Sequence, residues 1–152
     1  MSSAEKDAAR STGISIAVVG IALGLAVAVY ISPKNEYFLG NFTYLWLPQA
    51  AVLALALACK ASRESVGGIA IALALYLSVF AFWFSGRNAD SMAWLGYFFS
   101  FPGALIGAGF AIVSEKPKTP ITPILQALGW VVLGVAVNQT VVCSTVMYCL
   151  GN

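Results

Sequence analysis

Residues 100–110 read SFPGALIGAGF, and the interpretation of the whole chain starts from this stretch. It holds one proline and three glycines in eleven residues, with apolar sequence on both sides. In water this density would break a helix, because glycine costs about 1 kcal/mol and proline about 3 kcal/mol relative to alanine. In a lipid bilayer the helix persists, since no water is present to bond exposed backbone groups. The stretch therefore indicates a membrane-spanning helix in which glycine allows close packing.

The spacing of the charged residues predicts five such helices. The chain has 152 residues, of which 60% are hydrophobic and only 9% charged, against about a quarter charged in a soluble domain. The charges leave five uncharged intervals: Ser11–Pro33, Tyr37–Cys59, Ser65–Gly86, Ser91–Ser114 and Thr119–Asn152. A spanning helix needs about 20 residues, and every interval exceeds this. We expect an all-α polytopic membrane helix bundle, a single membrane domain over residues 1–152, with spans at 13–31, 42–59, 66–84, 92–113 and 120–138 and a short tail at 139–152.

The distribution of basic residues predicts the orientation. Six Lys and Arg flank the spans on one side, and two lie on the other. The six are Lys6, Arg10, Lys60, Arg63, Lys116 and Lys118, and the two are Lys34 and Arg87. The positive-inside rule places the N-terminus in the cytoplasm and the C-terminus outside. The high Ala and Gly content favours a bacterial source, and hence the bacterial inner membrane.

Two spans carry a stripe of small residues at helical spacing. In the fourth span Gly96, Ser100, Gly103 and Gly107 share one face, and in the first Gly20 and Gly24 form a second GxxxG pair. Such faces allow helices to approach closely in a membrane, so we expect them to be helix-packing seams, facing each other as antiparallel neighbours. The alternative is a chance stripe, because Ala and Gly are common in bacterial membrane helices.

Two prolines interrupt the predicted spans. Pro102 and Pro48 remove the donors that would bond the carbonyls of Phe98 and Tyr44, so we expect a kink at each.

Residue types that carry chemistry are scarce. The chain has no histidine, and its six carboxylates are scattered over tails and loops. No charged residue lies within a predicted span, whereas proton-coupled transporters and pumps mark their routes with such residues. No phosphate-binding loop, CxxC or nucleophile elbow occurs. We expect no enzymatic activity, no cofactor and no metal, and the net charge of +2 gives no sign of nucleic-acid binding.

Two cysteines lie near the C-terminus. Cys143 and Cys149 fall in the predicted outer tail, where an oxidising compartment favours a disulfide. Their spacing fits neither a redox pair nor a zinc site, and the alternative is two small apolar residues on one helix.

The aromatic residues are unevenly distributed. Sixteen of the 19 lie near the predicted outer ends of the spans, whereas interfacial belts normally occur at both faces. Aromatic side chains are enriched at binding hot spots. We therefore predict a partner-binding surface, called here the predicted rim, formed by Tyr37, Phe38, Trp46, Trp83, Trp94 and Tyr97.

These features favour a non-enzymatic protein that binds a membrane-active protein partner within the lipid bilayer. Small multi-span immunity proteins, which protect a cell from membrane-active toxins of its own kind, are similar in size, low charge and lack of catalytic residues. An accessory subunit of a larger membrane complex belongs to the same class. The alternatives are a homo-oligomeric channel built through the glycine faces, which predicts a polar constriction that the sequence lacks, and a thiol-redox protein using the two cysteines.

Overall fold

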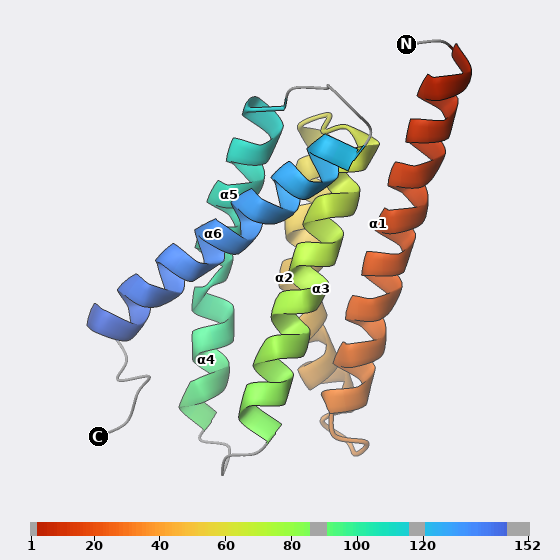
Figure 1. Ribbon diagram of the computed structural model, residues 1–152. Coiled ribbons are helices and arrows are strands. Elements are labelled where there is room, and N and C mark those ends of the chain that lie inside the picture. The colour runs from red at the N-terminus through yellow and green to blue at the C-terminus, as the bar shows by residue number, and fades with distance from the viewer. Residues whose placement is uncertain (1–2, 86–90, 116–120, 146–152) are drawn as a thin grey trace.

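The chain is a helix bundle whose five membrane-length segments run alternately in opposite directions. The computed structural model describes residues 3–85, 91–115 and 121–145, and every regular element within these ranges is helical. In chain order the helices are α1 (Ser3–Ile31), α2 (Phe38–Ala58), α3 (Arg63–Ser85), α4 (Ser91–Phe99), α5 (Phe101–Val113) and α6 (Ile121–Thr145) (Figure 1).

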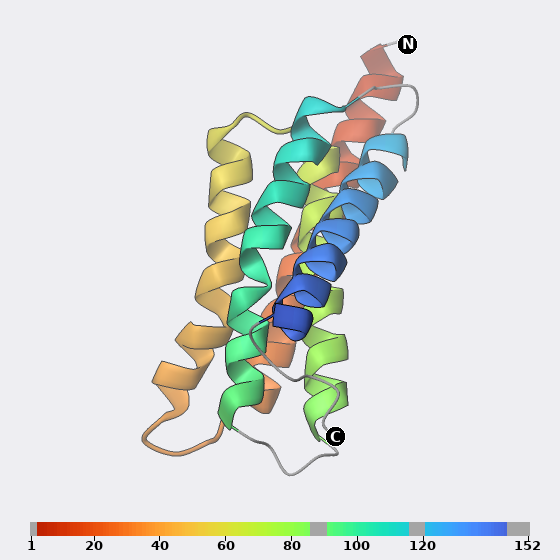
Figure 2. The ribbon, with the colours of Figure 1, turned by 90° about the vertical axis from the view of Figure 1, so that its left-hand side faces the viewer.

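The bundle has two ends that differ in composition. The end with the start of α1 and residues 59–62, between α2 and α3, is called here the basic end, because it holds Lys60 and Arg63. The opposite end, with residues 32–37 between α1 and α2, is called the aromatic end. Helix α6 starts at the basic end and runs toward the aromatic end, and in both views of the ribbon its described part ends partway along the bundle (Figures 1 and 2).

Five segments are long and apolar enough to cross a membrane: Ser11–Ile31, Phe38–Ala58, Arg63–Trp83, Leu95–Val113 and Ile121–Thr145. They coincide with the spans expected from the uncharged intervals, so the architecture is that of a multi-pass membrane protein. Helix α6 continues to Thr145, although the expected span ended at residue 138 and a tail was expected from there. The polar side chains of residues 138–140 do not stop it, since a helix bonds its own backbone groups.

The fourth span consists of two helices. Helix α4 ends at Phe99 and α5 begins at Phe101, with Pro102 in its first turn. The kink expected at Pro102 is therefore a break, near the middle of the span. Helix α2 instead runs through Pro48 without interruption.

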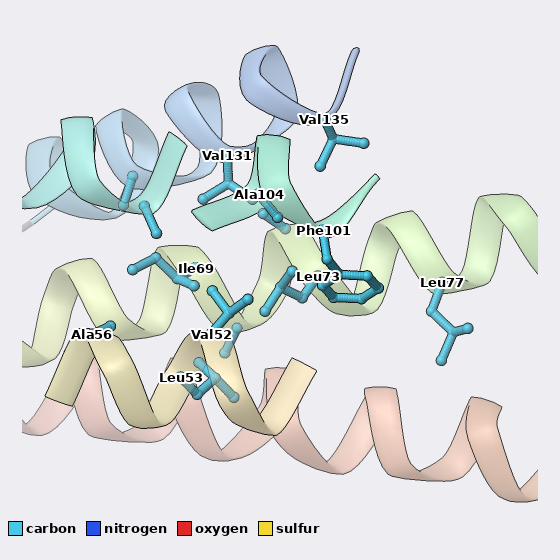
Figure 3. Packing of buried hydrophobic residues seen from close by; sticks show 14 of the residues in the cluster. Val52, Leu53, Ala56, Ile69, Leu73, Leu77, Phe101, Ala104, Val131 and Val135 are labelled. Atoms are coloured by element: carbon cyan, nitrogen blue, oxygen red, sulfur yellow. The ribbon is translucent and has the colours of Figure 1, made fainter. Parts of the chain in front are cut away.

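Helix α3 lies at the centre of the bundle and contacts α1, α2, α4, α5 and α6. Its buried residues form one core with residues from α2, α5 and α6, and Figure 3 shows their side chains meeting. Labelled there are Val52, Leu53, Ala56, Ile69, Leu73, Leu77, Phe101, Ala104, Val131 and Val135.

The glycine stripe of α1 meets the backbone of α3. A Cβ at Gly20 would lie 2.8 Å from the backbone carbon of Ala70, and one at Gly13 would lie 2.8 Å from the backbone nitrogen of Glu64. Gly24 is buried where α1 meets α2, and a Cβ there would lie 2.9 Å from Oε1 of Gln49. At Gly13 and Gly20 a side chain larger than hydrogen would collide with backbone and push α1 away from α3, whereas at Gly24 it would displace the side chain of Gln49.

The glycine stripe of α5 meets α6. A Cβ at Gly103 would overlap the carbonyl oxygen of Gly134, and one at Gly107 would overlap that of Trp130. The expectation that the stripes of the first and fourth spans face each other is therefore wrong, because α3 and α6 supply the opposing surfaces. Gly134 provides a matching smooth face on α6, since a Cβ there would overlap the carbonyl oxygen of Gly103.

Candidate interaction surface at the aromatic end

The two halves of α3 differ in how well the other helices cover them. From Ser65 to Ala70 every residue is buried. Near this end α6 crosses α3 so closely that a Cβ at Gly68 would overlap the carbonyl oxygen of Ile124. Helix α6 then diverges across the bundle (Figure 1), and α3 exposes Leu75, Val79, Phe82 and Trp83 toward the aromatic end.

Aromatic side chains dominate the exposed surface at this end. Phe82 is 86% exposed and Trp83 58%, both on the otherwise central helix α3. Seven aromatic residues with described side chains are exposed, and six of them belong to the aromatic half: Tyr30, Tyr37, Phe82, Trp83, Phe98 and Phe99. These six are called here the exposed rim. The seventh, Phe110, lies on α5 toward the basic end and stacks on Trp130.

The members of the predicted rim have different environments. Tyr37 and Trp83 are exposed, whereas Phe38 and Trp46 are half-buried, and Trp46 packs against the core. The side chain of Trp94 lies outside the described residues. Tyr97 is fully buried, with 0% of its surface exposed, so its placement in the predicted rim is wrong.

Tyr97 is instead the centre of a buried aromatic cluster. Its ring stacks on Tyr76 of α3, with centroids 5.5 Å apart, and contacts Phe80 at 5.3 Å and Phe101 edge-on at 5.1 Å. The sequence contains a pattern that could have predicted this burial. Tyr97 lies at helical spacing from Ser100, Ala104 and Ala111, and all four residues are buried. Counting aromatic residues near a span end ignores this phase, which is why Tyr97 was misplaced.

The hydroxyl of Tyr97 joins α4 to α2. It accepts a hydrogen bond from Nε2 of Gln49 (3.0 Å) and donates one to the carbonyl oxygen of Leu45 (2.8 Å). Gln49 is 3% exposed and follows Pro48. A buried amide in a membrane bundle needs such a partner, because hydrocarbon offers none.

Polar side chains also satisfy carbonyls at the break in the fourth span. The carbonyl oxygen of Tyr97 accepts hydrogen bonds from the backbone nitrogen of Ser100 (3.3 Å) and from its Oγ (2.6 Å). The carbonyl oxygen of Phe99 accepts one from Nδ2 of Asn138 on α6 (2.6 Å). Ser100 is fully buried, and Gly96 is buried on α4. In the sequence, Ser100 belongs to a predicted packing stripe, whereas nothing marks Asn138, because its position beside Phe99 depends on the Gly103–Gly134 contact.

The cysteines with described side chains differ in their chemical state. Cys143 is disulfide-bonded, and Cys149, its expected partner, lies outside the described residues. Cys59 is a free, exposed thiol at the basic end. Within ranges 3–85, 91–115 and 121–145, no three His, Cys, Asp or Glu residues gather in a way that could hold a metal ion.

Comparison with known proteins places the chain in no family. No protein-family model matches it, and no curated protein and no solved structure matches it significantly. The function proposed below is therefore inferred from the geometry of the chain itself.

Proposed function

We propose that this chain is a non-enzymatic bacterial inner-membrane protein that binds a membrane-active protein partner through its exposed rim. In this proposal the basic end faces the cytoplasm and the aromatic end faces outward. The partner is a protein that enters the bilayer from outside or is embedded in it. A toxin-immunity protein or an accessory subunit of a membrane complex has this role.

The observation that carries the proposal is the exposure of Phe82 and Trp83 on the central helix. A core helix that is covered on all sides at one end, and that exposes one aromatic face at the other, presents a surface available to a partner. Lipid alone explains exposed Leu and Val residues throughout such a bundle. An interfacial belt occurs at both membrane faces, so it explains only part of an exposed aromatic surface concentrated at one end.

The packing of the glycines argues against the homo-oligomeric channel. Channel formation through glycine faces requires these faces to be available to another subunit. Gly20, Gly103, Gly107 and Gly134 all oppose backbone of the same chain. The buried polar residues Gln49 and Ser100 bond to groups within the bundle, so they do not offer the polar constriction that a pore needs.

Affinity purification from the native host in mild detergent tests the proposal, using two matched double variants. Phe82→Ala with Trp83→Ala removes two large side chains of the exposed rim. Leu55→Ala with Leu57→Ala removes two exposed apolar side chains of α2 at the basic end. Truncating central aromatic contacts costs about 2 kcal/mol or more each at a hot spot.

We expect the wild type and the α2 variant to retain one stoichiometric partner, and the rim variant to lose it by at least about tenfold at equal membrane abundance. Equal retention by both variants contradicts the proposed surface. A homo-oligomer without a second protein would move the assignment to the channel.

The proposed orientation has a test that uses a native thiol. Cys59 is exposed and free at the basic end, and Cys143 is in a disulfide. A membrane-impermeant maleimide should therefore label Cys59 only after the cells are permeabilised. A cysteine placed at Asn35, exposed at the other end, should react in intact cells. The reverse pattern would invert the topology.

A further inference from the structure

The two halves of the fourth span are attached to the bundle in different ways. Helix α5 is held by α6 through backbone contacts at Gly103 and Gly107, which leave no room for adjustment. Helix α4 reaches α2 through the hydroxyl of Tyr97, and it reaches α3 through the ring of the same residue. Tyr97 therefore supplies both the hydrogen bonds of α4 to α2 and a ring contact with α3. Helix α4 has two further contacts: the ring of Phe98 stacks on Tyr44 of α2 (5.7 Å), and the carbonyl oxygen of Phe99 accepts a hydrogen bond from Asn138 of α6.

The break between these halves is prepared for bending. Breaking a helix in a membrane normally leaves carbonyl groups without donors, which is costly in hydrocarbon. Here Ser100 bonds the carbonyl oxygen of Tyr97, and Asn138 bonds that of Phe99. The donors to these two carbonyls are the side chains of Ser100 and Asn138 and the backbone nitrogen of Ser100, and none of them is an i to i−4 helical donor. The angle between α4 and α5 can therefore change without breaking a helical hydrogen bond at either carbonyl.

The connection to α2 lies beside a second proline. Pro48 removes one helical donor from α2, and the next residue, Gln49, donates to the hydroxyl of Tyr97. The same hydroxyl donates to the carbonyl oxygen of Leu45, one helical turn before Gln49. The tyrosine thus bonds α2 on both sides of Pro48.

We propose that α4 is a hinged segment of the fourth span, with its hinge at Ser100, and that the hydrogen bonds of Tyr97 to Gln49 and Leu45 latch it against α2. Phe98 and Phe99 follow Tyr97 on α4 and belong to the exposed rim, so the latch contributes to their position together with the stacking of Phe98 on Tyr44. This last step rests on the proposed function, whereas the hinge and latch do not. Tyr97 and Gln49 are positioning residues, buried away from any partner.

The chain contains a matched control for the latch. Tyr76 stacks on Tyr97, and its buried hydroxyl lies near Ser100 without forming a hydrogen bond of good geometry. Tyr76→Phe and Tyr97→Phe each remove one oxygen atom from the same aromatic cluster. Only the second removes the hydrogen bonds between α4 and α2.

Distances between spin labels, measured by pulsed electron resonance on the full chain in detergent, test the proposal without a partner. Cys59→Ser removes the free thiol, and Cys143 does not react because it is disulfide-bonded. One labelled pair, at Leu47 and Leu95, reports α2 against α4. The other, at Ile106 and Val132, reports α5 against α6. All four positions are exposed.

We expect Tyr97→Phe to broaden or shift the distance distribution of the α2–α4 pair and to leave the α5–α6 pair unchanged. Tyr76→Phe should leave both pairs as in the wild type. If Tyr97→Phe does not fold, Gln49→Met removes one bond of the latch at similar volume and should give the same pattern to a smaller degree. Wild-type distributions in these latch variants overturn the proposal, as does equal broadening of both pairs, which would indicate general loosening.

Partner retention provides the second arm. Tyr97→Phe should lower partner recovery severalfold at unchanged membrane abundance, while Tyr76→Phe should not. A moved α4 with unchanged recovery would overturn the link between latch and rim and leave the hinge standing. A missing partner in the wild type would instead count against the proposed function alone, because the distances still decide the latch.

Discussion

Helices α4 and α5 form one pass through the membrane, yet they are held by contacts of different kinds. Helix α5 lies against α6 with glycine opposite glycine, so its position is fixed by backbone atoms that cannot move aside. Helix α4 is held by side chains, through the hydrogen bonds of Tyr97 and the stacking of Phe98 on Tyr44, and it ends at a break with bonded carbonyls. The comparison indicates that one half of the pass is rigid and that the other, which carries part of the exposed rim, is adjustable.

The largest expected effect lies in the rigid half. Gly103→Ala places a Cβ on the carbonyl oxygen of Gly134, and overpacking of this kind costs about 1–3 kcal/mol. Gly109→Ala is the matched control on the same helix, because a Cβ there meets nothing within 4 Å. It should be neutral or stabilising by up to about 1 kcal/mol through helix propensity. Unfolding in mixed detergent with increasing dodecyl sulfate measures both, and equal effects would contradict the seam.

The seam between α1 and α3 should show a smaller effect of the same sign. Gly20→Ala brings a Cβ to 2.8 Å from the backbone of Ala70, a shallower collision than at Gly103. We expect a cost of about 1 kcal/mol. Gly129→Ala on α6, which faces open space, serves as the control. A larger loss of unfolding free energy for Gly20→Ala than for Gly103→Ala would contradict the expectation that the α5–α6 contact is the tighter of the two.

The cap at the break should contribute less. Asn138→Ala removes the hydrogen bond to the carbonyl oxygen of Phe99, and interhelical bonds of this type contribute about 0.6 kcal/mol on average in membranes. Thr140→Ala is the control, since the hydroxyl of Thr140 bonds within its own helix. Thermal unfolding followed by size-exclusion chromatography compares the two. Identical unfolding midpoints for Asn138→Ala and Thr140→Ala would show that the hydrogen bond of Asn138 does not stabilise the break.

The smallest expected effect is at the basic end of α5. Nε2 of Gln126 donates to the carbonyl oxygen of Ser114 (2.7 Å) and to its Oγ (2.9 Å), joining the end of α5 to α6. Gln126→Met should cost less than about 0.6 kcal/mol, because the glycine contacts remain. The labelled pair at Ile106 and Val132 should not change. A change in this pair would indicate that side chains, too, determine the position of α5.

The sequence predicts the number of the spans and the limits of the first four to within a few residues, because hydrocarbon thickness sets a length that the uncharged intervals must match. It does not predict the end of the fifth, because no charged residue marks it. It predicts that Gly20 and Gly103 lie on smooth faces, because helical spacing is fixed. The sequence does not predict which helix each smooth face packs against, since one smooth face fits another equally well. The pairing depends on the close crossing of α6 over α3 at Gly68 and on the position of Gly134 opposite Gly103. The break at Ser100 follows from Pro102. One of the hydrogen bonds that satisfy carbonyl groups at the break comes from Asn138, which is far from the break in the sequence and could not be predicted.

The central claim is that a protein partner contacts the aromatic end. A photo-activatable amino acid placed at Phe82 or Phe98, and at the exposed control position Val18 near the start of the first span, measures this in living cells of the native host. We expect one discrete protein adduct when the probe is at position 82 or at position 98, and none when it is at position 18. With the probe at position 98, the double substitution Phe82→Ala with Trp83→Ala should abolish the adduct. Adducts with a second copy of this chain, or with lipid alone at all three positions, would contradict it.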